Sequence, residues 1–249
     1  TPALRALRTR YPNAHIALLT TPHAAPILTG TGLVDEVIVF RLGTFERARD
    51  LIRPAALRVL LATGWGLRRM RFDTQITFHQ LSTRGGAIKQ ALIALAVGAR
   101  RRIGLDNGRG WFFNDKVPDR GFGVRHQAQY WGELAARLGA MPDNAPPITP
   151  QTPEDLIWAQ EHLPPGPRYA ALHPGSGGLN AARRWSPQGF AAVAEDVWKR
   201  LRLRIVIVGG ADDGANALTA LLNQSMPGQF VDLAGQTTLG QLRAVLAQC

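Results

Sequence analysis

Cysteine is almost absent from this 249-residue sequence, which has only Cys249. A lone cysteine excludes a disulfide within the sequence and a cysteine-based metal site, and it is typical of a reducing compartment. Long apolar runs are also lacking, because the stretch 88–97 is too short and too interrupted to cross a bilayer. No charged segment followed by an apolar one opens the sequence. We therefore expect a globular cytoplasmic protein.

Acidic residues are scarce in the first 150 positions, which hold 10 acidic and 21 basic side chains, whereas residues 151–249 hold eight of each. The whole net charge of +11 therefore belongs to the first part. A one-sided basic field attracts nucleic acid, an anionic membrane surface or a phosphorylated acidic substrate. A proteome rich in arginine would explain the overall excess, but it would not explain why the second part is neutral.

Strand-like and helix-like patterns alternate along the sequence, which favours parallel sheets with crossover helices. In the first part we expect helices at 3–10, 24–28, 45–61 and 87–97 and strands at 15–19, 36–40, 74–78 and 102–104. In the second part we expect strands at 169–173, 204–208 and 230–233 and helices at 187–200, 216–222 and from 239.

Prolines cluster between the two parts and predict a connector. The expected domains are residues 1–150, a connector at 151–168 and a second domain at 169–249. The first domain is expected to lack its first strand, because Thr1-Pro2-Ala3-Leu4 has the pattern of a first helical turn with no strand before it. A doubly wound nucleotide-binding half has about five or six strands. Because only three strands are expected after the connector, the second domain is predicted to be incomplete.

The strongest local signal is the Gly-rich segment 173–178, which follows an apolar strand and precedes two arginines. Glycines after a strand often form only a turn. Small residues also let backbone amides approach an anion, and arginine pairs bidentately with phosphate oxygens. The pattern predicts a diphosphate site formed by Ser176, Gly177, Arg183 and Arg184.

A second loop, 209–213, follows the next apolar strand and ends in Asp212 and Asp213. A carboxylate at the carboxyl end of a parallel strand commonly accepts hydrogen bonds from ribose hydroxyls. The same residues suit the N-cap of the following helix. Both interpretations, ribose binding and helix capping, stay open.

Several segments, taken in order, resemble glycosyltransferase family 9, the ADP-heptose:lipopolysaccharide heptosyltransferases. The resemblance covers essentially the whole sequence. It is carried by Thr1-Pro2-Ala3-Leu4-Arg5-Ala6-Leu7-Arg8 with Tyr11-Pro12, Val34-Asp35-Glu36-Val37-Ile38, His173-Pro174-Gly175-Ser176, Ala182-Arg183-Arg184-Trp185-Ser186 and Asp232-Leu233-Ala234-Gly235-Gln236-Thr237-Thr238-Leu239.

The resemblance implies a GT-B type α/β architecture, with two Rossmann-like domains that have parallel sheets. The first would bind the acceptor and the second the ADP-sugar. Residues 79–84 are similar to the family's acceptor segment, which makes Arg84 a candidate for an acceptor anion; the alternative is a solvated arginine at a helix start. The implied acceptor is lipid A that carries Kdo sugars, at the anionic surface of the inner membrane, which fits the basic first domain. No RNP-type aromatic strand or Gly-x-x-Gly clamp indicates nucleic acid.

The implied activity is inverting transfer of a heptose from ADP-heptose to the lipopolysaccharide inner core, without metal or cofactor. Arg183 replaces a family lysine and Ser186 a proline, which puts the detail of donor geometry in question. The family's catalytic aspartate lies upstream of Thr1, and its Asp-x-Gly-x-x-His donor motif lies downstream of Cys249, so no catalytic residue is assigned within this sequence. Another nucleotide-sugar donor, such as a UDP-sugar, and a non-catalytic anion-binding module are the alternatives.

Overall fold

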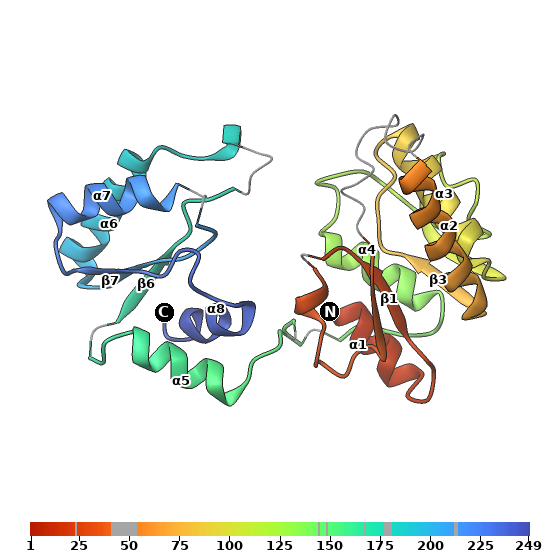
Figure 1. Ribbon diagram of the computed structural model, residues 1–249, viewed down its shortest axis with the longest axis horizontal. Coiled ribbons are helices and arrows are strands. Elements are labelled where there is room, and N and C mark those ends of the chain that lie inside the picture. Colours follow the sequence, from red (N-terminus) through yellow and green to blue (C-terminus); the bar gives the residue numbers. More distant parts are fainter. Residues whose placement is uncertain are drawn as a thin grey trace. The chain divides into compact units, whose positions relative to one another are not determined.

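The chain forms two compact units, Thr1–Ile148 and Thr149–Cys249 (Figure 1). The computed structural model describes residues 1–22, 24–40, 54–143, 145–147, 149–166, 168–176, 181–211 and 214–249, with the backbone alone for 54–61 and 181. Every strand pair in these ranges is parallel. The expected α/β class, with Rossmann-like units built on parallel sheets, is confirmed.

The first unit contains two sheets, in the strand orders β1-β2 and β3-β4-β5. Its elements, in chain order, are α1 (Pro2–Arg10), β1 (Ala17–Thr20), the 3-10 helix η1 (Ala25–Ile27), β2 (Glu36–Val39), α2 (Pro54–Arg69), β3 (Thr74–Thr77), α3 (Arg84–Val97), β4 (Arg101–Asp106), β5 (Asp115–Pro118) and α4 (Gln127–Ala136). Thr74 aligns with Arg101, and Ile103 aligns with Asp115.

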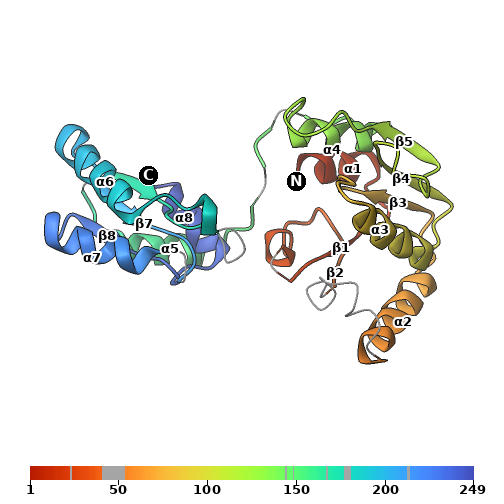
Figure 2. The same cartoon turned by 90° about the horizontal axis from the view of Figure 1, so that it is seen from above.

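Helices cover both faces of the β3-β4-β5 sheet, with α1 and α4 on one face and α3 on the other (Figure 2). On the α4 face, Ile103 and Leu105 of β4 pack against Tyr130 and Leu134. On the α3 face, the core contains Phe113, whose ring lies against Gly104: a Cβ at that glycine would be 2.2 Å from the ring. Glycine is therefore required at this strand position for Phe113 to reach the core.

The second unit is a three-layer structure around the sheet β6-β7-β8. Its elements are α5 (Pro153–His162), β6 (Tyr169–Leu172), the 3-10 helix η4 (Ala181–Arg183), α6 (Pro187–Leu201), β7 (Arg204–Ile207), α7 (Ala215–Ser225), β8 (Phe230–Asp232) and α8 (Leu239–Leu246). Ile205 and Ile207 of β7 pack with α6 and α7, while Val206 and Val208 pack with α5 and α8. A strand buried on both faces is apolar on both, as Ile205, Val206 and Ile207 of β7 are.

Most of the expected elements are present, with one extension, one change of helix type and two omissions. The helix expected at 45–61 lies partly outside the described residues; the described helix, α2, continues to Arg69. The segment 24–28 contains a 3-10 helix and not an α-helix. β5 and α4 were not expected from the sequence. The predicted connector carries α5, which packs against α8 in the second unit. The division into acceptor and donor domains stays a prediction.

Candidate functional site

The carboxyl ends of β6, β7 and β8 bring three loops together at one edge of the second sheet. The amide of Val208 donates to the carbonyl of Leu172 at 2.9 Å, which ties the ends of β6 and β7. The amide of Gly235 donates to the carbonyl of Gly209 at 2.7 Å, which ties the loops after β7 and β8. Open α/β sheets bind their ligands at this edge. The three loops therefore form the candidate site of the second unit.

Two glycines allow these loops to pack closely. Gly209 has φ +126°, and a Cβ there would lie 2.8 Å from Cδ2 of His173, so the imidazole ring lies directly against the Gly209 backbone. Gly235 has φ +73°, and a Cβ there would lie 2.7 Å from the Cβ of Ala211. Both backbone conformations disfavour L side chains, and both positions lack space for one.

Ser176 and Arg184 are brought together by the loop after β6. The Nε of Arg184 donates a hydrogen bond to Oγ of Ser176 at 3.3 Å, and both side chains are half-buried. Arg183 is exposed, at the last residue of η4. The structure therefore brings together two of the predicted phosphate-binding residues. Gly177, Asp212 and Asp213 lie outside the described residues, so their predicted roles stay predictions.

Helix α6 begins at Pro187, three residues after Arg184, and its start is fixed by local contacts. Ser186 is the N-cap and its hydroxyl accepts from the amide of Gly189 at 3.1 Å. The ring of Trp185 packs edge-on to Phe190, with ring centroids 5.3 Å apart, and lies against Gly189, where a Cβ would be 2.5 Å from the ring. These contacts anchor the segment that carries Arg184. The positive end of the α6 dipole thus follows Arg184 closely in the chain, and a helix N-terminus favours an anion nearby.

Asp232, at the end of β8, was not assigned a role from the sequence. Its Oδ2 accepts from the hydroxyl of Thr219 at 2.5 Å and its Oδ1 accepts from the amide of Ala234 at 3.0 Å. The side-chain amide of Gln236 donates to the Asp232 carbonyl at 2.7 Å. This residue shapes the loop that reaches Gly235. The sequence signal that could have identified Asp232 is a carboxylate at the end of the third strand of a βαβ series.

A polar cluster occupies the corresponding edge of the β3-β4-β5 sheet. The side-chain amide of Gln80, a buried residue after β3, donates to Oδ1 of Asp119 at 3.1 Å. Asn107 donates to the carbonyl of Leu81 at 3.1 Å, and Gln127 donates to the side-chain oxygen of Gln80 at 3.5 Å. Gln80, Asn107 and Asp119 each follow a different strand, and Gln127 is the first residue of α4. Their spacing in the sequence does not indicate that they lie together.

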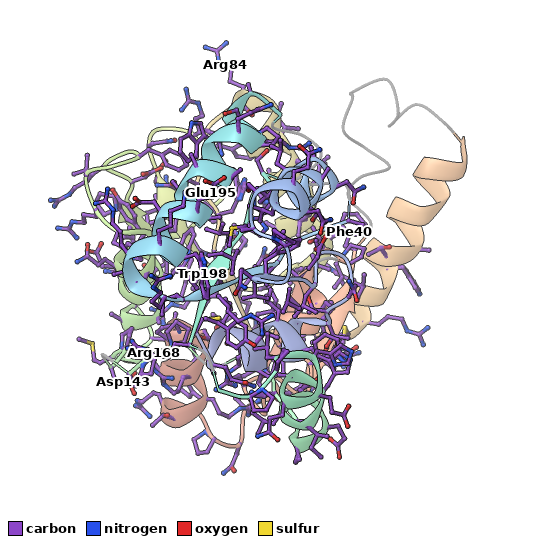
Figure 3. The ribbon with its side chains drawn as sticks, turned by 90° about the vertical axis from the view of Figure 1, so that its left-hand side faces the viewer. Phe40, Arg84, Asp143, Arg168, Glu195 and Trp198 are labelled. Atoms are coloured by element: carbon purple, nitrogen blue, oxygen red, sulfur yellow. The ribbon has the colours of Figure 1, made fainter. Side chains whose placement is uncertain are left out.

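Arg84 lies beside this cluster in the chain, at the first residue of α3. Thr83 caps the helix, accepting from the amide of Gly86 at 3.0 Å. The Arg84 side chain is exposed and extends outward (Figure 3). His79 lies five residues before Arg84. Partial burial of its imidazole is the main cause that lowers its pKa, and the charge of Lys89 adds to the effect. His79 is therefore neutral at pH 7, and Arg84 is a permanent cation at the start of α3.

A comparison with protein-family models matches residues 62–249 to Glycosyltransferase family 9 (heptosyltransferase). The chain belongs to this family. The matched residues include both the polar cluster of the first unit and the three loops of the second. No curated protein matches the chain.

Solved structures with the same fold include heptosyltransferases. E. coli ADP-heptose LPS heptosyltransferase II aligns with all of this chain and 72% of its own, at 23% identity and a TM-score of 0.65. A glycosyl transferase family 9 protein from Veillonella parvula aligns with all of this chain and 68% of its own, at 22% identity and a TM-score of 0.75. E. coli heptosyltransferase WaaC with ADP-2-deoxy-2-fluoro heptose aligns at 17% identity and a TM-score of 0.70, over 75% of its length.

No three His, Cys, Asp or Glu side chains in the described ranges are grouped so that they could hold a metal ion. Among the described helices, none has the length and apolar character needed to span a membrane. Metal-independent transfer stays a prediction.

Proposed function

We propose that this family 9 chain takes part in the transfer of a heptose from ADP-heptose to the lipopolysaccharide inner core. The observation that carries the proposal is the hydrogen bond between Arg184 and Ser176, at the edge of the second sheet where a nucleotide diphosphate would bind. A half-buried guanidinium next to a hydroxyl and a helix N-terminus is a favourable environment for a diphosphate.

In this proposal the second unit stabilises the departing ADP. As the bond between sugar and diphosphate breaks, negative charge grows on the diphosphate oxygens, and preorganised donors lower the barrier. Arg184, Ser176 and the amides of the loop supply those donors, with Arg183 and Gly177 as further contacts. Asp212 and Asp213 are assigned to the ribose hydroxyls. The base that takes the acceptor proton is an aspartate upstream of Thr1 in a longer polypeptide, and the transfer inverts the anomeric centre without a metal.

The acceptor, in turn, is assigned to the first unit. Its net positive charge would attract the Kdo carboxylates and lipid A phosphates of an inner-core acceptor and the anionic surface of the inner membrane. Arg84, an exposed cation at the start of α3, is the candidate for direct contact with one of these anions. A cytoplasmic protein at the periphery of the inner membrane is the location that follows from this acceptor.

The test is sugar transfer from ADP-heptose to a Kdo-bearing lipid A acceptor, measured on a polypeptide that also contains the residues upstream of Thr1. Arg184→Ala is expected to lower kcat/KM at least tenfold, because a hydrogen bond to a charged group contributes about 1.5–3 kcal/mol. Arg200→Ala is the matched control, since Arg200 forms only an exposed helical ion pair with Asp196. Equal loss in the two variants, or transfer from UDP-sugars alone, would overturn the proposed donor.

A further inference from the structure

One side of helix α3 exposes three large apolar side chains. Ile88 is 56% exposed, Leu92 53% and Leu95 70%. Their spacing of four and three residues places them on one side of the helix, in line with Arg84 at its start. The other side, which contains Ala94, packs in the core. A helix that is apolar on its exposed side as well as on its buried side indicates a contact surface for a further apolar partner.

Two exposed tryptophans extend this apolar surface. Trp111 is 70% exposed, and its ring packs edge-on to Phe112, with ring centroids 5.5 Å apart. Phe112 belongs to the core cluster that contains the buried alanines of α3, so Trp111 lies near that helix. Trp65 is 68% exposed and follows Gly64 of α2, which faces Ala96 of α3. Helices α2 and α3 lie side by side (Figure 1). We term these five exposed side chains the α3 face: Trp65, Ile88, Leu92, Leu95 and Trp111.

Basic side chains surround the α3 face. Residues 62–105 hold eight basic side chains and one acidic side chain, and the sequences of α2 and α3 contain no acidic residue. The Nη1 of Arg68 donates to the carbonyl of Leu95 at 3.1 Å, which places an exposed guanidinium next to the apolar side chains. Trp65 lies one turn before Arg68 on the same side of α2. Arg84 and Lys89 add positive charge in the first half of α3.

This combination matches the chemistry of an anionic lipid bilayer. A helix that lies in a membrane interface buries its apolar side at the boundary between headgroups and acyl chains, and its basic residues contact anionic lipids. Tryptophan is enriched at the same depth. The 14 residues of α3 span about 21 Å, less than the hydrocarbon core of about 30 Å. Helix α3 could therefore lie on a bilayer, although it could not cross one.

A second copy of the chain fits the α3 face less well. In a two-fold dimer the same patch of each copy meets the other. Arg68 and Arg84 of one copy would then approach the same cations of the other, and neither α2 nor α3 has a carboxylate to pair with them. The partner has to offer an apolar surface and negative charge together, as anionic lipids do.

We propose that the α3 face is the surface by which the first unit binds an anionic membrane. In this arrangement Ile88, Leu92 and Leu95 enter the boundary between headgroups and acyl chains, while the basic side chains contact the lipid phosphates. The proposal rests on the proposed function for the presence of a membrane, and it adds which side of the first unit meets the lipid. Because Arg84 is in line with the three apolar side chains, binding would hold this candidate acceptor contact at the level of the phosphates.

The first test measures binding of the 249-residue chain to vesicles of phosphatidylcholine with increasing fractions of phosphatidylglycerol. We expect binding to rise with the phosphatidylglycerol fraction and to fall in high salt. Leu92→Gln combined with Leu95→Gln should lower the partition coefficient about tenfold, because it removes apolar area without changing charge. The control combines Leu156→Gln with Ile157→Gln, two exposed apolar residues of α5 that should be replaceable without effect.

The second test asks which side chains enter the bilayer, and it leaves Leu92 unchanged. Cys249 is the only cysteine in the sequence, so Cys249→Ser allows a single new cysteine to be labelled. Leu95→Cys and Ile157→Cys are each labelled with the fluorophore NBD. On phosphatidylglycerol vesicles the emission from position 95 should shift to shorter wavelength and be quenched by spin-labelled lipids. The emission from position 157 should not change.

Several results would overturn the proposal. Equal binding by the two glutamine pairs, or vesicle binding with no change in emission at position 95, would show that another surface meets the lipid. Dimerisation in sedimentation velocity that Leu92→Gln with Leu95→Gln abolishes, without vesicle binding, would assign the α3 face to a second copy. Binding of single-stranded RNA without vesicle binding would assign the positive charge to nucleic acid. The vesicles contain neither lipid A nor ADP-heptose, so a failure here is distinct from a failure of sugar transfer.

Discussion

Gly235 lies so close to Ala211 that a Cβ on the glycine would be 2.7 Å from the alanine Cβ and 3.0 Å from its Cα. This contact holds the loop after β8 against the loop after β7, next to the hydrogen bond from Gly235 to Gly209. The candidate donor site depends on it, because these two loops and the loop after β6 share one edge of the sheet.

Replacing Gly235 with alanine is expected to destabilise the second unit and to weaken nucleotide binding. Gly228 is a matched control, because it has the same φ of +73° and open space where a Cβ would lie. Both variants should lose about 1–2 kcal/mol of unfolding free energy from the left-handed backbone. Only Gly235→Ala should lose more than that, by about 1–3 kcal/mol for the overlap. Urea unfolding measures both, and equal losses would contradict the proposed packing.

The ion pairs of Asp115 are expected to make the free energy of unfolding depend on pH. It accepts from Arg137 at 2.6 Å and from Arg101 at 2.7 Å, with its side chain 10% exposed. Burial would raise the pKa of this carboxyl, but the two guanidiniums outweigh it and hold the pKa below its usual value. The carboxylate form is therefore favoured in the folded chain.

Asp115→Asn should lower the unfolding free energy by about 1–3 kcal/mol at pH 7, since it leaves two arginines without their anion. Because the folded pKa is the lower one, the contribution is complete above the unfolded pKa of about 3.9 and is lost as the pH falls through the folded value. The gap between wild type and variant should thus close below about pH 4. Asp196→Asn, which removes an exposed pair, should have little effect. A gap that does not change with pH would refute this role of Asp115.

Arg84→Ala should weaken binding of an anionic acceptor without changing stability. Arg84 is exposed on α3, so its removal leaves the core intact. Binding of the 249-residue chain to vesicles containing Kdo-bearing lipid A should weaken about threefold to tenfold, and the loss should shrink in high salt. Arg100→Ala is the control, an exposed arginine in the same unit. Indistinguishable vesicle binding by the two variants would assign Arg84 to the solvated surface.

Elements with a strong apolar pattern could be predicted from the sequence. The strand expected at 204–208 is present as β7 over Arg204–Ile207, because Ile205, Val206 and Ile207 form an apolar run that is buried on both faces. β5 was missed because Val117 is the one buried residue among its four. The helix after 126 was missed because its N-cap is His126, which replaces the usual Ser, Thr, Asp or Asn.

The C-terminal end of α2 could not be predicted from the sequence for a different reason, which is packing between helices. Gly64 and Gly66 are poor helix formers and disfavour a helix that continues past 61. In the structure a Cβ at Gly64 would lie 3.5 Å from the Cβ of Ala96, an ordinary contact distance, so this position of α2 faces α3. Packing between helices outweighs local propensity here, and a single sequence does not reveal which helix will be the neighbour.

The residue types of the donor site could be predicted, but their contacts could not. Ser176, Arg183 and Arg184 were all expected near a phosphate, with Arg183 in the main role, and the structure adds that Arg184 is the arginine that donates a hydrogen bond to the serine. The contacts of Asp232 with Thr219 and of Gly235 with Ala211 join residues 13 and 24 positions apart, which only the crossover connections of the sheet bring together.

The most direct test of the donor site is calorimetric titration of ADP into the 249-residue chain, its Arg184→Ala variant and the Arg200→Ala control. We expect saturable binding of ADP by the chain and the control, and affinity lower by tenfold or more in Arg184→Ala, because a charge-assisted hydrogen bond to the diphosphate is lost. Equal ADP affinity in all three proteins would contradict a diphosphate site at Ser176 and Arg184.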